Sequence, residues 1–249
     1  QLYDYQIPEK LSEFIQVGVR VQLPFGGRET EGVIVERVGI PERAGELKNI
    51  TRVLSDVPVA TTQSLLLIDT IAAHFGANAW DVIRSAIPAR VASVDKNFAI
   101  RSLHIENKAK FSVEFQTLAP YIEAHDQLVN LVLSNSGSGS VLVIAPDEKD
   151  VDRIIQSLDM NGVKALKLTA AIPREERYRN YLQAMHGGNS VVVGTRSAIF
   201  APVYNLNTII VHKESSLDHY EIRSPGWNSR SVALIRSKSE SVKLILTGF

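Results

Sequence analysis

The sequence predicts a multidomain α/β protein, with a β-rich N-terminal region, a short helical region and then a lobe built on a parallel β-sheet. Two observations support this. Short apolar segments that alternate with polar residues fill the N-terminal region. From residue 118 onward, helical segments alternate with β-branched apolar runs, which is typical of an open parallel sheet. A chain of 249 residues is long enough for two or three small domains.

We assign residues 1–58 to the β-rich domain. Residues 17–25 alternate in polarity, a turn follows at Gly26, and residues 32–38 are predicted to form the partner strand. Residues 47–54 supply a further strand. The result is a small barrel or sandwich of short strands.

Residues 59–94 change to helical spacing. An apolar stripe over residues 65–75 ends at Gly76, and a second helix over residues 80–87 ends at Pro88. Two short helices at this separation suit a winged-helix unit, and a plain helical hairpin fits the spacing equally well. The polar residues 95–111 are predicted to be a linker.

Residues 112–249 are assigned to the parallel-sheet lobe. Predicted helices and strands alternate along it, with helices at 121–134, 150–161 and 174–186 and strands at 140–146, 163–168, 191–193 and 208–211. Residues 174–179 are most simply a charged, solvated helix face. The alternative is that Arg177 and Arg179 face phosphates.

The glycine run SGSGS at residues 136–140 is not predicted to bind phosphate. A phosphate-binding loop follows a strand and opens a helix, because the helix N-terminus provides the N–H donors. Here the run closes a helix and leads into a strand, and no Gly-x-x-x-x-Gly-Lys-Ser/Thr occurs anywhere in the chain. We interpret it as a helix-to-strand turn.

A better phosphate candidate follows the strand at 191–193. We expect Gly194 to let the backbone approach a ligand. Thr195, Arg196 and Ser197 offer hydroxyls and a guanidinium, which suit phosphate oxygens. Thr195 and Arg196 are the predicted DNA-phosphate contacts.

The strand at 208–211 ends without the acidic residues that hold magnesium in a motor ATPase. It runs instead into His212, Lys213, Glu214 and Ser215. A metal site built from His212, Glu214, Asp218 and His219 lacks the i, i+4 spacing of a zinc-binding helix, so no metal is predicted.

Composition narrows the function classes. Lys+Arg and Asp+Glu both number 27, which argues against coating of nucleic acid but allows a local DNA site. The chain has no cysteine, no apolar run long enough for a membrane span and no signal peptide, so we expect a cytoplasmic protein without a membrane partner. A first residue other than Met and a final apolar run at 244–249 indicate a fragment of a longer protein.

Several segments resemble the PriA (primosomal protein N′) family of replication-restart helicases. The most specific is VGTRSAIFAP at residues 193–202, which is close to the family's phosphate-contacting GTRSA loop. Other segments follow in the expected order: YDYQIP at 3–8, GVRVQLPFG at 18–26, LKNI at 47–50, WDVIRSAIP at 80–88 and NLNTIIV at 205–211.

The resemblance implies an N-terminal domain that holds a DNA 3′ end, a winged helix and a RecA-like helicase lobe. By position, Tyr3 would stack on the terminal base and Asp4 would hydrogen-bond its edge. Gly26 would admit the sugar with its 3′-OH, and Lys48 would meet a phosphate. From spacing alone, Tyr3 would be a packed strand aromatic and Lys48 a solvated charge.

The departures from the family pattern concern ATP. Residues 112–120, where the family's phosphate loop belongs, read SVEFQTLAP, and HKES stands at 212–215 in place of Asp-Glu-Glu-His. At 247–249, TGF replaces the family's Ser-Ala-Thr. Some actinobacterial members are degenerate in this way. The family's zinc-binding cysteines would lie beyond residue 249, so no cofactor is predicted within this chain.

The resulting prediction is a DNA-binding protein that is not an ATPase or helicase. It would recognise stalled or branched forks with a 3′ end and recruit primosome or replisome-loading proteins. The alternatives are an active ATP-dependent 3′–5′ helicase with an unconventional nucleotide site, and a protein-interaction scaffold whose DNA pocket is vestigial.

Overall fold

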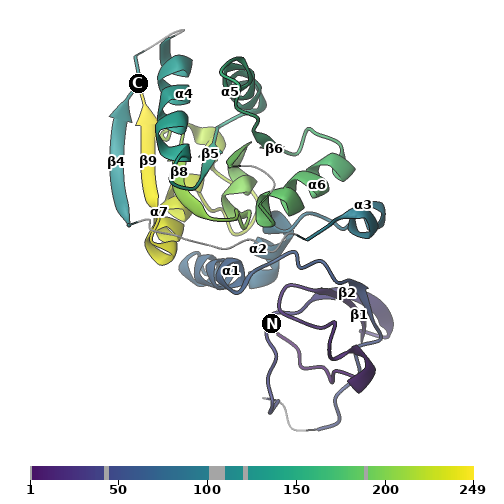
Figure 1. Cartoon of the computed structure of the whole chain (residues 1–249). Helices are drawn as coiled ribbons and strands as arrows, with labels where there is room; N and C mark the ends of the chain where they lie inside the picture. The colour runs from purple at the N-terminus through teal and green to yellow at the C-terminus, as the bar shows by residue number, and fades with distance from the viewer. Residues whose placement is uncertain (1, 42–44, 101–109, 120–122, 188–189) are drawn as a thin grey trace.

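The computed structural model describes residues 2–41, 45–100, 110–119, 123–187 and 190–249 (Figure 1). A small antiparallel sheet near the N-terminus and a larger parallel sheet with flanking helices form its two ends. The helices α1 and α2 lie between them (Figure 1). The predicted α/β fold class, with a β-rich N-terminal domain and a parallel-sheet lobe, is confirmed.

The N-terminal sheet has three strands in the order β2-β1-β3, preceded by a 3-10 helix, η1 (Glu9–Leu11). The central strand β1 (Arg20–Phe25) pairs with β2 (Arg28–Val33) and β3 (Arg52–Ser55). The prediction of a partner strand at 32–38 was wrong, because the two-residue turn at Gly26 and Gly27 lets pairing start at once, with Phe25 opposite Arg28. The strand predicted at 47–54 is confined to β3, with an isolated bridge between Gln6 and Asn49 before it.

The helical region contains three helices, α1 (Thr62–His74), α2 (Ala79–Ala86) and α3 (Ala92–Asn97). Thr61 and Ser64 cap α1 reciprocally through side chain and backbone, and Asn78 caps α2. The helix α3 was not predicted, and it takes up the start of the segment assigned as a linker. Most of that segment, residues 101–109, lies outside the described residues.

The lobe is built on six parallel strands in the order β4-β9-β8-β5-β7-β6. Its strands and helices are β4 (Ser112–Thr117), α4 (Glu123–Ser136), β5 (Ser140–Ile144), α5 (Glu148–Met160), β6 (Leu166–Leu168), α6 (Arg174–Met185), β7 (Val191–Gly194), η2 (Arg196–Phe200), β8 (Leu206–Val211), η3 (Leu217–His219), α7 (Ser229–Glu240) and β9 (Lys243–Gly248). The strand β4 was not predicted. Among the described residues it pairs only with β9, at the sheet edge, so Val113 and Phe115 stay exposed and its apolar signal is weak.

The two faces of the sheet carry separate cores. Helices α4 and α5 pack on one face, over residues such as Val141 and Val143. On the other face, α6, η2 and α7 pack over Leu142 and Ile144, and α1 and α2 extend the same core. The strands β5 and β7 are buried on both faces, which explains their uninterrupted apolar sequence. The glycine run joins α4 to β5, as predicted.

Polar contacts also join the N-terminal regions to the lobe. The Tyr178 hydroxyl of α6 donates to Asp95 Oδ1 at 2.7 Å, and Arg90 contacts the same carboxylate. The Tyr181 hydroxyl donates to the carbonyl of Val59 at 2.8 Å. Both tyrosines are buried, so these hydrogen bonds fix α6 against α3 and against the segment that connects the N-terminal sheet to α1.

Gly18 is required for this connection. Its φ is +86°, and a Cβ atom there would lie 2.0 Å from the carbonyl oxygen of Ala60. We expect Gly18→Ala to reduce the free energy of unfolding by about 3 kcal/mol, because both strain and a backbone clash result. Urea denaturation followed by circular dichroism measures this.

Gly27→Ala is the matched control. Gly27 has φ +78° but no atom within 4 Å of its Cβ position, so this variant carries conformational strain without a clash. We expect this variant to reduce the free energy of unfolding by about 1 kcal/mol. Equal losses in the two variants would contradict a role for the Gly18–Ala60 contact.

Candidate nucleic-acid interface

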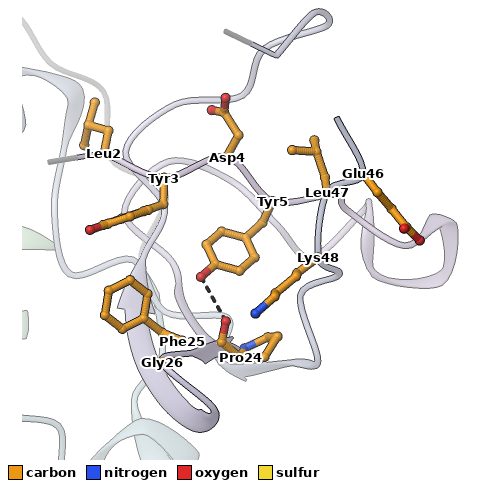
Figure 2. Close-up of a pocket in the computed structure, with 10 residues that line it drawn as sticks. All are labelled: Leu2, Tyr3, Asp4, Tyr5, Pro24, Phe25, Gly26, Glu46, Leu47 and Lys48. Atoms are coloured by element: carbon orange, nitrogen blue, oxygen red, sulfur yellow. Dashed lines mark hydrogen bonds between the residues drawn. The ribbon is translucent and has the colours of Figure 1, made fainter. Parts of the chain in front are cut away.

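The four residues predicted to hold a DNA 3′ end line one cavity in the N-terminal domain. The cavity has a volume of about 540 Å³, in the range of small-ligand sites. Its lining residues are Leu2, Tyr3, Asp4, Tyr5, Pro24, Phe25, Gly26, Glu46, Leu47 and Lys48 (Figure 2). Three separate segments of the chain therefore converge here.

Backbone pairing brings the first and last of these segments together. The N–H of Gln6 donates to the Lys48 carbonyl at 2.9 Å, and the N–H of Ile50 donates to the Gln6 carbonyl at 3.0 Å. Tyr5 then attaches the N-terminal segment to the end of β1, because its hydroxyl donates to the Pro24 carbonyl at 3.1 Å (Figure 2). Burial raises the pKa of the Tyr5 hydroxyl, with a further contribution from Tyr3, so Tyr5 stays a neutral donor.

The aromatic part of the cavity is formed by Tyr3 and Phe25. Their ring centroids are 4.9 Å apart in an edge-to-face arrangement. Tyr3 is 48% exposed, so its ring is positioned by Phe25 and still accessible to a ligand. In Figure 2, Tyr3 projects toward Phe25, whereas the Asp4 carboxylate projects to the other side of the segment from Tyr5.

Gly26 forms the turn at the cavity wall. Its φ is +58°, which is unfavourable for other residues, and apart from its chain neighbours no atom of the described residues lies within 4 Å of its Cβ position. The backbone at this turn is therefore open to a ligand. Lys48 is exposed and extends its ammonium toward Pro24 (Figure 2). The cavity thus combines an aromatic face, a carboxylate, an accessible backbone and a cation.

Sequence reasoning missed Tyr5 and Phe25. Tyr5 lies two residues from Tyr3 in an extended segment, so alternation places both rings on the same side. That signal was available in the sequence. The contact of Tyr3 with Phe25 joins two segments that are distant in the sequence, which no local pattern indicates.

The expected role of Gly194 in ligand approach is wrong. A Cβ atom there would lie 2.3 Å from the Leu168 carbonyl oxygen and 2.5 Å from Ala198 Cβ. The glycine is thus required by the protein's own packing, where β6 and η2 crowd the end of β7.

The predicted phosphate contact Arg196 has internal partners. Its Nε lies 3.3 Å from Glu221 Oε2, and its Nη1 lies 3.4 Å from the Asp218 carbonyl. Thr195 donates its backbone N–H to Leu168 at 3.3 Å. Both residues are only partly buried, so a phosphate could reach the loop, but it would compete with Glu221 for the guanidinium.

The residues at the end of β8 are engaged in structural contacts. Lys213 Nζ binds both carboxylate oxygens of the buried Asp150, at 2.8 and 2.7 Å. Glu214 pairs with Arg230, and His212 Nδ1 lies 3.0 Å from Thr247 Oγ1. Ser215 follows in an exposed turn. An ammonium thus stands where Mg²⁺-ATP would need a metal-binding carboxylate, so these residues do not fit that group.

Two histidines near this strand end are buried. His219 Nε2 donates to the His212 carbonyl at 2.9 Å. Within the described residues, no group of three or more His, Cys, Asp or Glu side chains is placed to hold a metal ion. No helix in the same residues is long and apolar enough to cross a membrane.

Residues 1–88 match a family model described as the 3′DNA-binding domain (3′BD) of PriA. Over 99% of its length the chain is 30% identical to the probable replication restart protein PriA of Mycobacterium tuberculosis, strain H37Rv. It is 28% identical to that of Mycobacterium leprae. The chain spans 42% of the length of both relatives.

The sequence identity to a solved structure is lower than the identity to these relatives. The C-terminal domain of Saccharomyces cerevisiae Dbp5, solved with Gle1 and IP6, is 15% identical and has a TM-score of 0.44. The match covers 56% of this chain and 75% of that domain.

The buried His219 makes stability depend on pH. Burial lowers its pKa from 6.5, and its Nδ1 has no hydrogen-bond partner in the described residues. The unfolded chain therefore binds the proton more tightly, and the free energy of unfolding should fall as pH drops below about 6.5. Urea denaturation at pH 7.5 and 5.5 measures this fall.

Between pH 7.5 and 5.5, the free energy of unfolding should fall less in His219→Gln than in the unmodified protein. Part of the dependence should remain, because burial also lowers the pKa of His186. An unchanged pH dependence in the variant would show that His219 does not contribute.

Proposed function

The chain belongs to the PriA family of replication restart proteins, and we propose that it binds the 3′ end of a DNA strand at a branched replication fork. One observation carries this proposal. Tyr3, Asp4, Gly26 and Lys48, which resemble the family's 3′-end residues, converge on one cavity inside the region that matches the family's 3′DNA-binding domain.

The cavity offers a complementary group for each part of a terminal nucleotide. The exposed face of Tyr3 stacks on the base, and the Asp4 carboxylate accepts a hydrogen bond from its edge. The open turn at Gly26 receives the sugar with its 3′-OH, and Lys48 neutralises the preceding phosphate. Stacking and phosphate contacts tolerate any base, which suits a protein that meets forks of every sequence.

We further propose that the protein acts without hydrolysing ATP. The pairing of Lys213 with Asp150 supports this, because a cation replaces the carboxylate that would bind magnesium. The absence of a phosphate-loop motif from the sequence supports it independently. The protein would then mark stalled forks at the bacterial nucleoid and recruit helicase-loading proteins.

The 3′-end assignment predicts discrimination between DNA termini. Fluorescence anisotropy should show about tenfold weaker binding to a fork with a 3′-phosphate than to the same fork with a 3′-OH, or about 1.4 kcal/mol. The added phosphate brings negative charge and bulk to the turn at Gly26, which is proposed to receive the 3′-OH.

Asp4→Ala should remove most of this discrimination. Asp69→Ala, which deletes an exposed carboxylate on α1, is the matched control and should retain it. Equal binding of the unmodified protein to both forks would favour the scaffold alternative instead.

The second proposal predicts that ATP has no effect. Phosphate release in the presence of forked DNA and magnesium should equal the protein-free background, and ATP should leave the fork affinity unchanged. ATP hydrolysis that is lost in a Lys213→Ala variant would instead support the helicase alternative, in which this strand end forms an unconventional nucleotide site.

A further inference from the structure

A second cavity lies where the helical region meets the lobe. Its volume is about 220 Å³. It is lined by residues 84–89, at and after the end of α2, by the carboxyl end of β6, and by parts of α6 and η2. Ligands of open α/β sheets bind at the carboxyl ends of the strands, so the position is a favourable one.

Arg177 of α6 is the most informative residue of this cavity. Its Nε is buried and has no hydrogen-bond partner in the described part of the chain. A buried donor without a partner costs free energy, and a guanidinium always keeps its charge. Its neighbour Arg179 is, by contrast, exposed and paired with Glu175 at 2.7 Å. Arg177 therefore has unused capacity for an anion.

The other polar groups of the cavity are of two kinds. Thr169 and Tyr181 are committed, because their hydroxyls donate to Glu148 and to the Val59 carbonyl. Arg84 lies at the rim, where one of its nitrogens binds Asp81 at 2.6 Å. The Ser85 hydroxyl donates to the Asp81 carbonyl at 3.5 Å, and Ser197 adds a further hydroxyl. None of the lining residues is acidic, and the two charged ones, Arg84 and Arg177, are both cations.

We propose that this cavity binds a phosphate of the DNA backbone, held by Arg177 and Ser197 from the lobe and by Arg84 from the helical region. Its volume is below the roughly 300 Å³ typical of small-molecule sites, so it suits one phosphate of a passing strand better than a whole nucleotide. Guanidinium groups bind phosphate oxygens through charge-assisted hydrogen bonds.

This site is separate from the 3′-end cavity and has a different signature. A backbone phosphate carries no information about the strand terminus. Loss of this phosphate contact should therefore weaken binding to all forks equally. Failure of the 3′-end proposal would appear instead as equal affinity for 3′-OH and 3′-phosphate forks.

The test compares Arg177→Gln with Arg179→Gln, which removes the same charge two residues along α6. Fluorescence anisotropy on both forks at several salt concentrations should show about tenfold weaker binding by Arg177→Gln, whatever the terminus. The slope of log K against log salt should become shallower by about 0.9, the value for one phosphate contact. Arg179→Gln should bind as the unmodified protein does.

A second, smaller substitution tests the same site in case Arg177→Gln does not fold. Ser197→Ala changes one hydroxyl, and we expect about threefold weaker binding of both forks from the loss of a single hydrogen bond. Unchanged binding by both Arg177→Gln and Ser197→Ala, or equal losses in Arg177→Gln and Arg179→Gln, would overturn the proposal.

Inorganic phosphate distinguishes DNA from a free anion. If the cavity binds DNA, phosphate at millimolar concentration should compete with the fork in the unmodified protein and not in Arg177→Gln. A different result would show that the site holds a free anion and that the DNA assignment is wrong. In that case phosphate would raise the melting temperature of the unmodified protein but not of Arg177→Gln, and the two proteins would bind the fork with equal affinity.

Discussion

The arrangement of the molecule depends on the close contact between Gly18 and the segment before α1. The N–H of Val59 donates to the Gly18 carbonyl at 2.9 Å, while the Val59 carbonyl accepts from Tyr181 of the lobe. A single residue is thus bonded to the N-terminal sheet through its N–H and to α6 through its carbonyl. Because buried hydrogen bonds have specific geometry, this segment fixes the direction of the 3′-end cavity relative to the lobe.

Ion pairs within the protein compensate the acidic groups at the strand ends of the lobe. At the ends of parallel strands, a nucleotide-binding protein gathers carboxylates and backbone donors that a ligand later satisfies. In this chain the Asp150 carboxylate is satisfied by Lys213, and Glu214 by Arg230. The acidic groups at these strand ends are therefore compensated within the protein, whereas Arg177 Nε is buried without a hydrogen-bond partner among the described residues.

Much of this could be predicted from the sequence, for reasons that differ between elements. The buried strands β5 and β7 are apolar on both faces, so their sequence alone identifies them. The edge strand β4 carries polar residues and was missed. Tyr3, Asp4, Gly26 and Lys48 were named together only through family resemblance, because their convergence depends on long-range pairing. Gly194 was misinterpreted, since a glycine needed for packing and one needed for a ligand look alike in sequence.

The pairing of β4 with β9 has a consequence for how the chain folds during synthesis. The register places Ser112 beside Lys243, so the first strand of the sheet has no partner until the last strand has left the ribosome. The N-terminal sheet, whose strands all lie within residues 20–55, can close much earlier. During translation the exposed Val113 and Phe115 belong to a strand with two open edges. Unpaired strand edges can pair with other chains, so β4 is open to such pairing until β9 joins it.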